Sequence, residues 1–164
     1  MKCIECREFE ANKESELCDT CEDKESGKIN GVLYLPALGL IVSIIGRAFQ
    51  LCDFSLGMFN HFNKTGFLSY YAIGASILLM IGFITSLYAA GLFFRRKKGI
   101  RQAMVIYYAI GSFATLYLTV IPYFIFNYQF SVNDLSTVVS GLVGSIIWIP
   151  YFLFSKRIDI VFCR

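Results

Sequence analysis

Residues 65–94 read TGFLSYYAIGASILLMIGFITSLYAAGLFF and contain no charged side chain. A helix rises about 1.5 Å per residue, so about 20 apolar residues cross a hydrocarbon core about 30 Å thick. The apolar residues are continuous, as at Ile77–Ile81, and do not alternate with polar ones. That pattern indicates a helix rather than a strand of a membrane barrel. The stretch therefore predicts one membrane-spanning helix.

Three further runs resemble this one. No charge occurs from Gln102 to Asn133 or from Leu135 to Ser155, and a weaker run extends from Gly31 past Arg47 to Leu51. We therefore expect an all-α membrane protein, a four-transmembrane-helix bundle with a small N-terminal metal knuckle of four cysteines. The expected helices lie at about 31–51, 68–94, 102–127 and 136–155, in a membrane domain (29–164) that follows a cytosolic head (1–28).

Composition supports this assignment. Of the 164 residues, 56% are hydrophobic and 16% charged, with a mean hydropathy of +0.58, whereas soluble domains are about one quarter charged. These values exclude a soluble globular enzyme, a disordered chain and a secreted disulfide miniprotein. The net charge of +3 is too small to indicate a nucleic-acid partner.

Basic residues predict the orientation, because Lys and Arg accumulate on the cytoplasmic side. Residues 52–66 and about 127–135 are then expected to face outward, and both termini the cytoplasm. Only Arg47 and Lys64 fall on or near the outer side. The other thirteen basic residues are Lys2, Arg7, Lys13, Lys24, Lys28, Arg95, Arg96, Lys97, Lys98, Arg101, Lys156, Arg157 and Arg164.

Arg47 lies about 24 Å along the helix from Gly31, near the expected outer interface. Two interpretations are open. The side chain either snorkels to the headgroup phosphates, which we favour, or pairs with Asp53 or Asp134, the only acids expected on the outer side. The spans hold no acid and no histidine, which makes an ion-coupled pump improbable.

Small residues predict where the helices approach closely, since helices in lipid associate through small side chains. Gly82, Ser86 and Ala90 are four residues apart and share one helix face. Similar pairs occur in the other spans: Gly39 with Ser43, Gly111 with Thr115, Ser140 with Gly144, and Gly141 with Ser145. We expect a compact bundle.

Prolines and tyrosines place polar groups inside the spans. The pattern Ile-Pro-Tyr-Phe occurs at Ile121–Phe124 and at Ile149–Phe152. Each proline frees the carbonyl four residues earlier, on Leu118 and Ile146. Three tyrosines are expected to lie deep enough for their hydroxyl groups to need partners in the bundle or water: Tyr107, Tyr108 and Tyr117.

The most specific chemical signal is a pair of Cys-x-x-Cys motifs, Cys3–Cys6 and Cys18–Cys21. Two such motifs can present four thiolates to one tetrahedral zinc ion. A site closed by four sulfur ligands is structural rather than catalytic. Iron and metal-free thiols remain alternatives. Disulfides and a thioredoxin-like pair are disfavoured by the expected cytosolic location and by the absence of a strand–helix context.

The head that carries these cysteines is acidic. Acids outnumber bases nine to five over residues 1–28, which argues against nucleic acid. So short a segment cannot build an apolar core, and bound metal would supply its folding energy. We interpret it as a docking surface for a cytosolic or membrane protein. Cys52, Cys163 and His61 stand alone, the cysteines in structural roles and the histidine as a solvated surface residue.

Two stretches carry a family resemblance. Gly31–Leu40 (GVLYLPALGL) and Ile147–Arg157 (IWIPYFLFSKR), with Phe162, resemble the opening and closing segments of the bacterial domain of unknown function 2569. The resemblance implies a four-span protein of the bacterial inner membrane, and it brings no activity. The cysteine head resembles the zinc ribbons of other bacterial membrane proteins, although Arg7 and Glu22 replace the usual glycines.

Three functions remain. We favour a non-enzymatic membrane module whose structural zinc site docks a partner and whose other partner is the lipid bilayer. The alternative is a transporter or permeation protein for a neutral or lipid-like substrate. An enzyme ranks last, because no nucleophile–base pair is evident.

Overall fold

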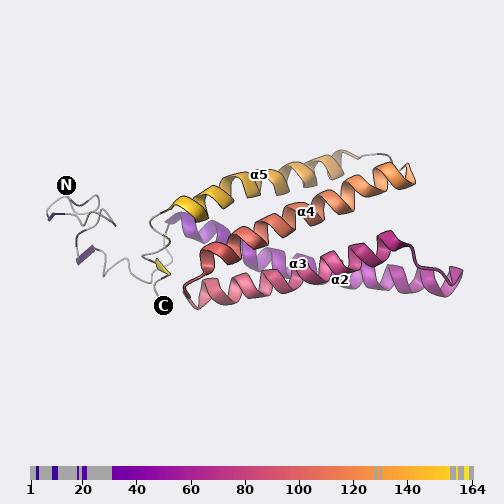
Figure 1. The fold of residues 1–164 in the computed structure, drawn as a ribbon, viewed down its shortest axis with the longest axis horizontal. Helices are drawn as coiled ribbons and strands as arrows, with labels where there is room; N and C mark the ends of the chain where they lie inside the picture. The colour runs from indigo at the N-terminus through magenta and orange to yellow at the C-terminus, as the bar shows by residue number, and fades with distance from the viewer. Residues whose placement is uncertain are drawn as a thin grey trace.

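The computed structural model describes residues 31–127, 129, 131–155, 158, 161 and 162, with residues 3, 9, 10, 18, 20 and 21 of the N-terminal segment. In this part of the chain the regular elements are helices (Figure 1). The four long ones are apolar enough to cross a membrane, which confirms the predicted fold class. In chain order the elements are η1 (Gly31–Leu33), α2 (Tyr34–Thr65), α3 (Tyr70–Phe94), α4 (Ile100–Phe126) and α5 (Val132–Phe154).

The first helix is longer than the expected 31–51, because α2 continues to Thr65. The thickness of the hydrocarbon core limits how many residues are in lipid, and it does not stop a helix that has no breaker. No proline occurs between Cys52 and Thr65. The helix ends at Gly66, whose φ of +67° is the left-handed conformation typical of a glycine C-cap and whose N–H donates to the Phe62 carbonyl at 2.7 Å.

Serine side chains cap the N-termini of two helices, α3 and α5. The Ala72 N–H donates to Ser69 Oγ at 3.2 Å at the start of α3. At the start of α5, Ser131 and Asp134 form a capping box: the Asp134 N–H donates to Ser131 Oγ, and the Ser131 N–H donates to Asp134 Oδ2 at 2.9 Å. These bonds satisfy amide groups that a helix leaves without partners in its first turn. The Asp134 carboxylate therefore caps the N-terminus of its own helix, α5.

The helices pack in chain order, α2 on α3, α3 on α4 and α4 on α5. Consecutive helices run in opposite directions, so the start of α2, the α3–α4 loop and the end of α5 gather at one end of the bundle (Figure 1). This end carries Arg95, Arg96, Lys97, Lys98 and Arg101, and we call it the basic end. The α2–α3 and α4–α5 connections lie at the opposite end.

The tightest packing is at the basic end. Phe93 of α3 is fully buried, and its ring centroid lies 5.1 Å from that of Phe162, which follows α5. Arg101 of α4 donates to the carbonyls of Leu153 and Ser155, at 3.1 and 2.9 Å, where α5 ends. The buried cluster consists of Leu33, Ala37, Leu40, Ala89, Phe93, Ile100, Ala103, Met104, Tyr107, Phe152, Ile158, Val161 and Phe162.

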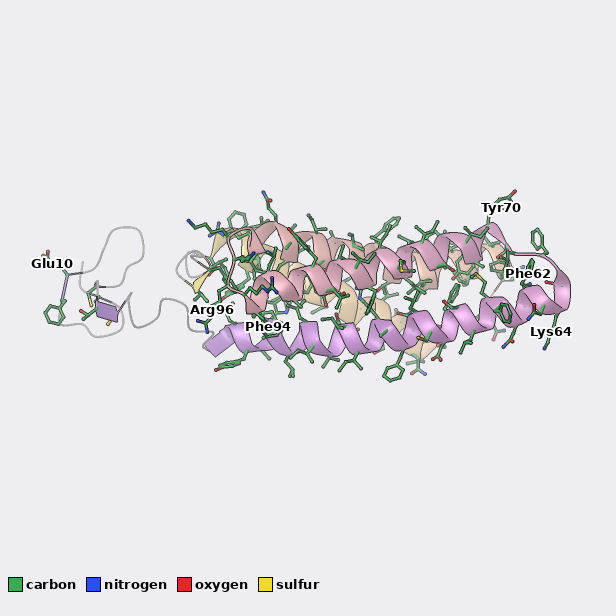
Figure 2. All side chains as sticks on the ribbon, turned by 90° about the horizontal axis from the view of Figure 1, so that it is seen from below. Glu10, Phe62, Lys64, Tyr70, Phe94 and Arg96 are labelled. Atoms are coloured by element: carbon green, nitrogen blue, oxygen red, sulfur yellow. The ribbon has the colours of Figure 1, made fainter. Side chains whose placement is uncertain are left out.

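Most of the remaining apolar side chains lie on the outside of the bundle and not between the helices. Only 11–33% of the most apolar window of each long helix is buried inside the structure. Exposed side chains cover the outside of the bundle along its length (Figure 2), and large apolar ones occur on all four helices. Acyl chains rather than water suit such a surface, because an apolar face of this size would not stay monomeric and soluble.

The basic end predicts a contrast between two neighbouring residues. Phe93 is 0% exposed and Phe94 is 48% exposed. Replacing Phe93 with alanine leaves a cavity in the cluster and should lower the free energy of unfolding by about 3–5 kcal/mol. Phe94→Ala should cost less than about 1 kcal/mol, because lipid or detergent can fill the space. Unfolding of the purified protein in detergent measures both, and equal losses would contradict this packing.

Candidate metal centre and polar groups of the bundle

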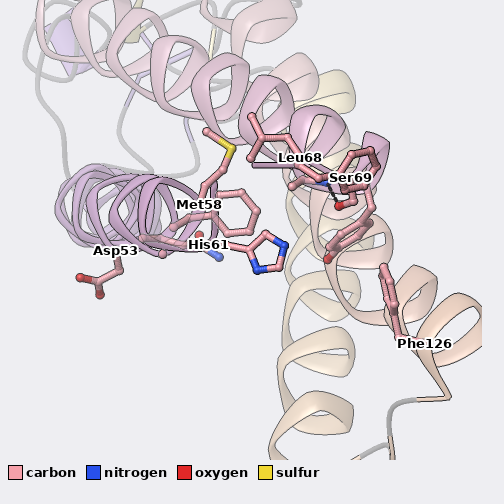
Figure 3. Close-up of a pocket in the computed structure, with 12 residues that line it drawn as sticks. Asp53, Met58, His61, Leu68, Ser69 and Phe126 are labelled. Carbon is pink, nitrogen blue, oxygen red and sulfur yellow. Dashed lines mark hydrogen bonds between the residues drawn. The ribbon is translucent and has the colours of Figure 1, made fainter. Parts of the chain in front are cut away.

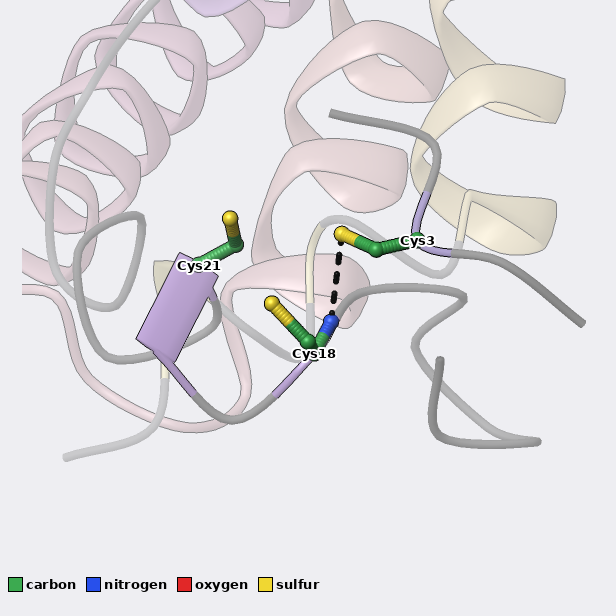
Figure 4. A group of neighbouring side chains, drawn as sticks. All are labelled: Cys3, Cys18 and Cys21. Atoms are coloured by element: carbon green, nitrogen blue, oxygen red, sulfur yellow. Dashed lines mark hydrogen bonds between the residues drawn. The ribbon is translucent and has the colours of Figure 1, made fainter. Parts of the chain in front are cut away.

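Three of the four predicted metal ligands lie together. The sulfur atoms of Cys3, Cys18 and Cys21 are all within 4.8 Å of one another (Figure 4). Cys3 and Cys18 are buried and Cys21 is half-buried. Zinc–sulfur bonds of about 2.3 Å in a tetrahedron separate the sulfurs by about 3.8 Å, so this spacing is close to that of a common ligand set. Cys6, the fourth predicted ligand, lies outside the described residues.

Backbone groups of the described residues make hydrogen bonds at and beside these sulfurs. The Cys18 N–H donates to Cys3 Sγ at 3.3 Å, which links the two motifs directly (Figure 4). The Cys21 N–H donates to the Cys18 carbonyl at 2.9 Å and closes a turn within the second motif, and the Cys3 N–H donates to the Phe9 carbonyl. An N–H aimed at sulfur stabilises a thiolate. The donor set and its surroundings therefore fit a soft divalent ion such as zinc.

Arg47 points into the bundle. Its Cζ atom lies 5.7 Å from the centroid of the Tyr107 ring on α4. Side chains on a helix lean toward its N-terminus, which here directs the guanidinium away from the outer interface. Both earlier interpretations, snorkelling to the outer headgroups and pairing with an acid, are therefore wrong for the described residues. Asp134 is held in the capping box, and the contact that the described residues give the Arg47 guanidinium is with Tyr107 and not with Asp53.

Glycines make room for this side chain. A Cβ on Gly82 of α3 would collide with Nη1 of Arg47, and one on Gly111 of α4 would lie 3.0 Å from Nη2. The predicted small face of α3 is confirmed, since Gly82, Ser86 and Ala90 are all buried. Gly141 faces Thr115, as expected of close approach, whereas Gly39 and Gly144 have no side chain near them.

Hydroxyl groups form a polar seam between the helices. The Tyr107 hydroxyl donates to Ser43 Oγ at 2.8 Å and so joins α4 to α2. Ser112 and Ser145 share a hydrogen bond between α4 and α5. The expectation that deep hydroxyls need partners is confirmed for Tyr107.

The carbonyl freed by Pro122 has a partner. The Tyr71 hydroxyl of α3 donates to the Leu118 carbonyl at 3.3 Å. The Tyr71 ring stacks on Tyr117, with centroids 5.6 Å apart and planes 7° apart, and meets Phe126 edge-on. A Cβ on Gly74 would collide with the Tyr117 hydroxyl. Tyr71 of α3 therefore stabilises α4 at the point where Pro122 interrupts its backbone hydrogen bonds. We call this hydrogen bond and ring stacking the Tyr71 brace.

A cavity of about 910 Å³ lies beside these aromatic residues, between the C-terminal half of α2, the start of α3 and the end of α4. The His61 ring projects into the space between these helices (Figure 3). Sequence analysis missed this cavity because it ended the helix near Leu51. In a continued helix, Gln50, Phe54, Met58 and His61 recur at helical spacing on one face, which was the available signal. The lining residues are Gln50, Asp53, Phe54, Gly57, Met58, His61, Phe67, Leu68, Ser69, Tyr71, Ala72 and Phe126.

Cys52 and His61, which stand alone in the sequence, both lie in α2. Cys52 is an exposed residue of α2. His61 is exposed, as expected, yet it also lines the cavity. Cys163 lies outside the described residues.

The brace at Leu118 gives a second matched pair. Tyr71→Phe removes the hydroxyl that serves the Leu118 carbonyl and should lower the free energy of unfolding by about 0.5–1.5 kcal/mol. Tyr70, its neighbour, is 90% exposed, and Tyr70→Phe should change nothing measurable. Denaturation in detergent micelles compares the two, and an unchanged stability of Tyr71→Phe would show that the bond contributes nothing.

A family model described as a protein of unknown function (DUF2569) matches residues 26–163. The match begins after Cys21, so it covers the membrane domain and leaves out the cysteine motifs. No curated protein and no solved structure matches the chain. The resemblance drawn from Gly31–Leu40 and Ile147–Arg157 is therefore confirmed over most of the sequence. The chain belongs to the DUF2569 family, whose function is unknown.

Proposed function

We propose that this multi-pass membrane protein is a non-enzymatic module whose N-terminal segment folds around one structural zinc ion and docks a protein partner. The observation that carries the proposal is the convergence of the sulfurs of Cys3, Cys18 and Cys21 within 4.8 Å. These residues come from two motifs with eleven residues between them, so the chain must turn back for their sulfurs to meet. Cys6 is proposed as the fourth ligand.

The chemistry of the ligands favours zinc. Thiolates are soft ligands, and a tetrahedral set of four leaves no open position for a substrate. The ion would therefore fix the shape of the segment. The excess of acids over bases across residues 1–28 suits a partner with a basic surface, because complementary charge speeds and orients docking.

The proposed location is the bacterial inner membrane with both termini in the cytoplasm. In support, α2 begins, α5 ends and the α3–α4 loop lies at the same end of the bundle (Figure 1), and that end is the basic one. A thiolate site on this side would be kept reduced.

A second candidate function is transport or permeation of a neutral or lipid-like substrate. The specific observation in its favour is the cavity of about 910 Å³, which lies within the usual size range of ligand pockets, roughly 300–1,000 Å³. Its walls are mainly apolar, with Phe54, Met58 and Phe126 among them, and a few polar groups such as Gln50 and His61. An amphiphile suits this combination.

Metal analysis tests the favoured function. Purified wild-type protein should contain one zinc ion per chain, and Cys18→Ser should lose at least nine tenths of it, because one missing thiolate opens the site. The matched control is Cys52→Ser, which removes an exposed cysteine on α2 and should keep the full content. Elemental mass spectrometry measures all three. Wild-type protein without stoichiometric zinc would contradict the proposal.

The proposed docking role can be tested with the same two variants. A protein partner that co-purifies in stoichiometric amount should be lost with Cys18→Ser and retained with Cys52→Ser. If the partner still binds after all four motif cysteines are replaced, the zinc segment is not the docking surface.

Orientation can be tested with two exposed lysines. Lys64 lies in the last turn of α2 at one end of the bundle, and Lys97 lies in the α3–α4 loop at the other. In a Cys52→Ser background, Lys64→Cys should react with a membrane-impermeant maleimide in intact cells. Lys97→Cys should react only after the membrane is permeabilised. The reverse pattern would place the termini outside.

A further inference from the structure

Among the described residues, the positive charge of Arg47 inside the bundle has no negatively charged partner. No hydrogen bond or ion pair joins the Arg47 guanidinium to any described residue, and its polar contact is with the face of the Tyr107 ring. The sequence has no Asp or Glu from residue 54 to residue 133. The two acids that flank this interval, Asp53 and Asp134, do not pair with Arg47.

The guanidinium lies near the middle of the membrane. Gly82 is twelve residues from the end of α3 at Phe94, which is about 18 Å along the helix. Gly111 is eleven residues from the start of α4 at Ile100, or about 17 Å. Both glycines adjoin the guanidinium nitrogens, so the charge is some 15 Å or more from the basic end of a hydrocarbon core about 30 Å thick.

A charge at this depth is costly unless it is paired. The contact with the Tyr107 ring offsets only part of this cost, because a cation–π contact is weaker than a buried ion pair. Arg47 is half-buried, so protein covers only part of its side chain.

The edge of a guanidinium is suited to an oxyanion, because its N–H groups donate in parallel to two oxygens. We propose that Arg47, in the space left by Gly82 and Gly111, forms an intramembrane binding site for a phosphate group. Such a group comes either from an anionic lipid headgroup or from free phosphate.

The test uses the purified full-length protein in nonionic detergent. Native mass spectrometry measures binding of dioleoyl phosphatidylglycerol against dioleoyl phosphatidylcholine, which has the same acyl chains but no net charge. A thermal-shift titration with inorganic phosphate is the second arm. Saturable binding of phosphatidylglycerol identifies a lipid source, and stabilisation by phosphate alone identifies a free anion.

Two variants should weaken whichever ligand binds by about tenfold or more. Arg47→Gln removes the charge. Gly82→Ala keeps the charge but pushes the guanidinium aside, so it serves even if Arg47→Gln fails to fold. Each has a control of the same chemistry: Arg95→Gln at the exposed loop, and Gly91→Ala on the same helix, where nothing lies within 4 Å of the new Cβ.

The controls should bind as the wild type does. The proposal is overturned if neither probe binds the wild type, or if binding to Gly82→Ala equals binding to Gly91→Ala. It is equally overturned if Arg95→Gln weakens binding as much as Arg47→Gln, because the ligand would then be held by surface charge. None of these readouts involves the cysteines, so their failure leaves the zinc proposal standing.

Discussion

Within lipid, backbone N–H and C=O groups have no water to bond, and this constraint governs the bundle. The helices satisfy it along their length, and the places where a helix is interrupted or ends need other donors. The Tyr71 hydroxyl serves the carbonyl that Pro122 releases on Leu118. Arg101 serves the last carbonyls of α5. Polar side chains for which the sequence suggests no role thus supply hydrogen bonds to the backbone of neighbouring helices.

The same solvent removes the usual reason for helices to associate, because lipid tails are as apolar as the side chains. Close approach and a few hydrogen bonds replace it. Gly82, Ser86 and Ala90 give α3 a thin face, and the Ser112–Ser145 pair joins α4 to α5. Bulk packing is concentrated at the basic end, where Phe93 and Phe162 meet. The opposite end is held by the Tyr71 brace and leaves the cavity open.

Sequence reasoning located the four spans because charges end them, and it found the Leu118 carbonyl because proline chemistry is local. It could not find Tyr71 as the partner, since that contact joins residues 47 positions apart. It misjudged α2, because it equated the end of the apolar run with the end of the helix. It judged the depth of Arg47 in the membrane from the position of its backbone alone. The side chain points along the helix, so the guanidinium lies beside Tyr107 instead. The cysteine motifs were evident from spacing alone, and three of the four ligands are now seen together.

The reach of α2 has a geometrical consequence. Its 32 residues extend about 48 Å, well beyond the thickness of a hydrocarbon core. If Tyr34 marks the inner boundary, Gln50 stands about 24 Å higher and His61 about 41 Å higher. The hollow between them then straddles the plane where acyl chains give way to headgroups. A molecule bound in this cavity would contact headgroups and water at one end and acyl chains at the other.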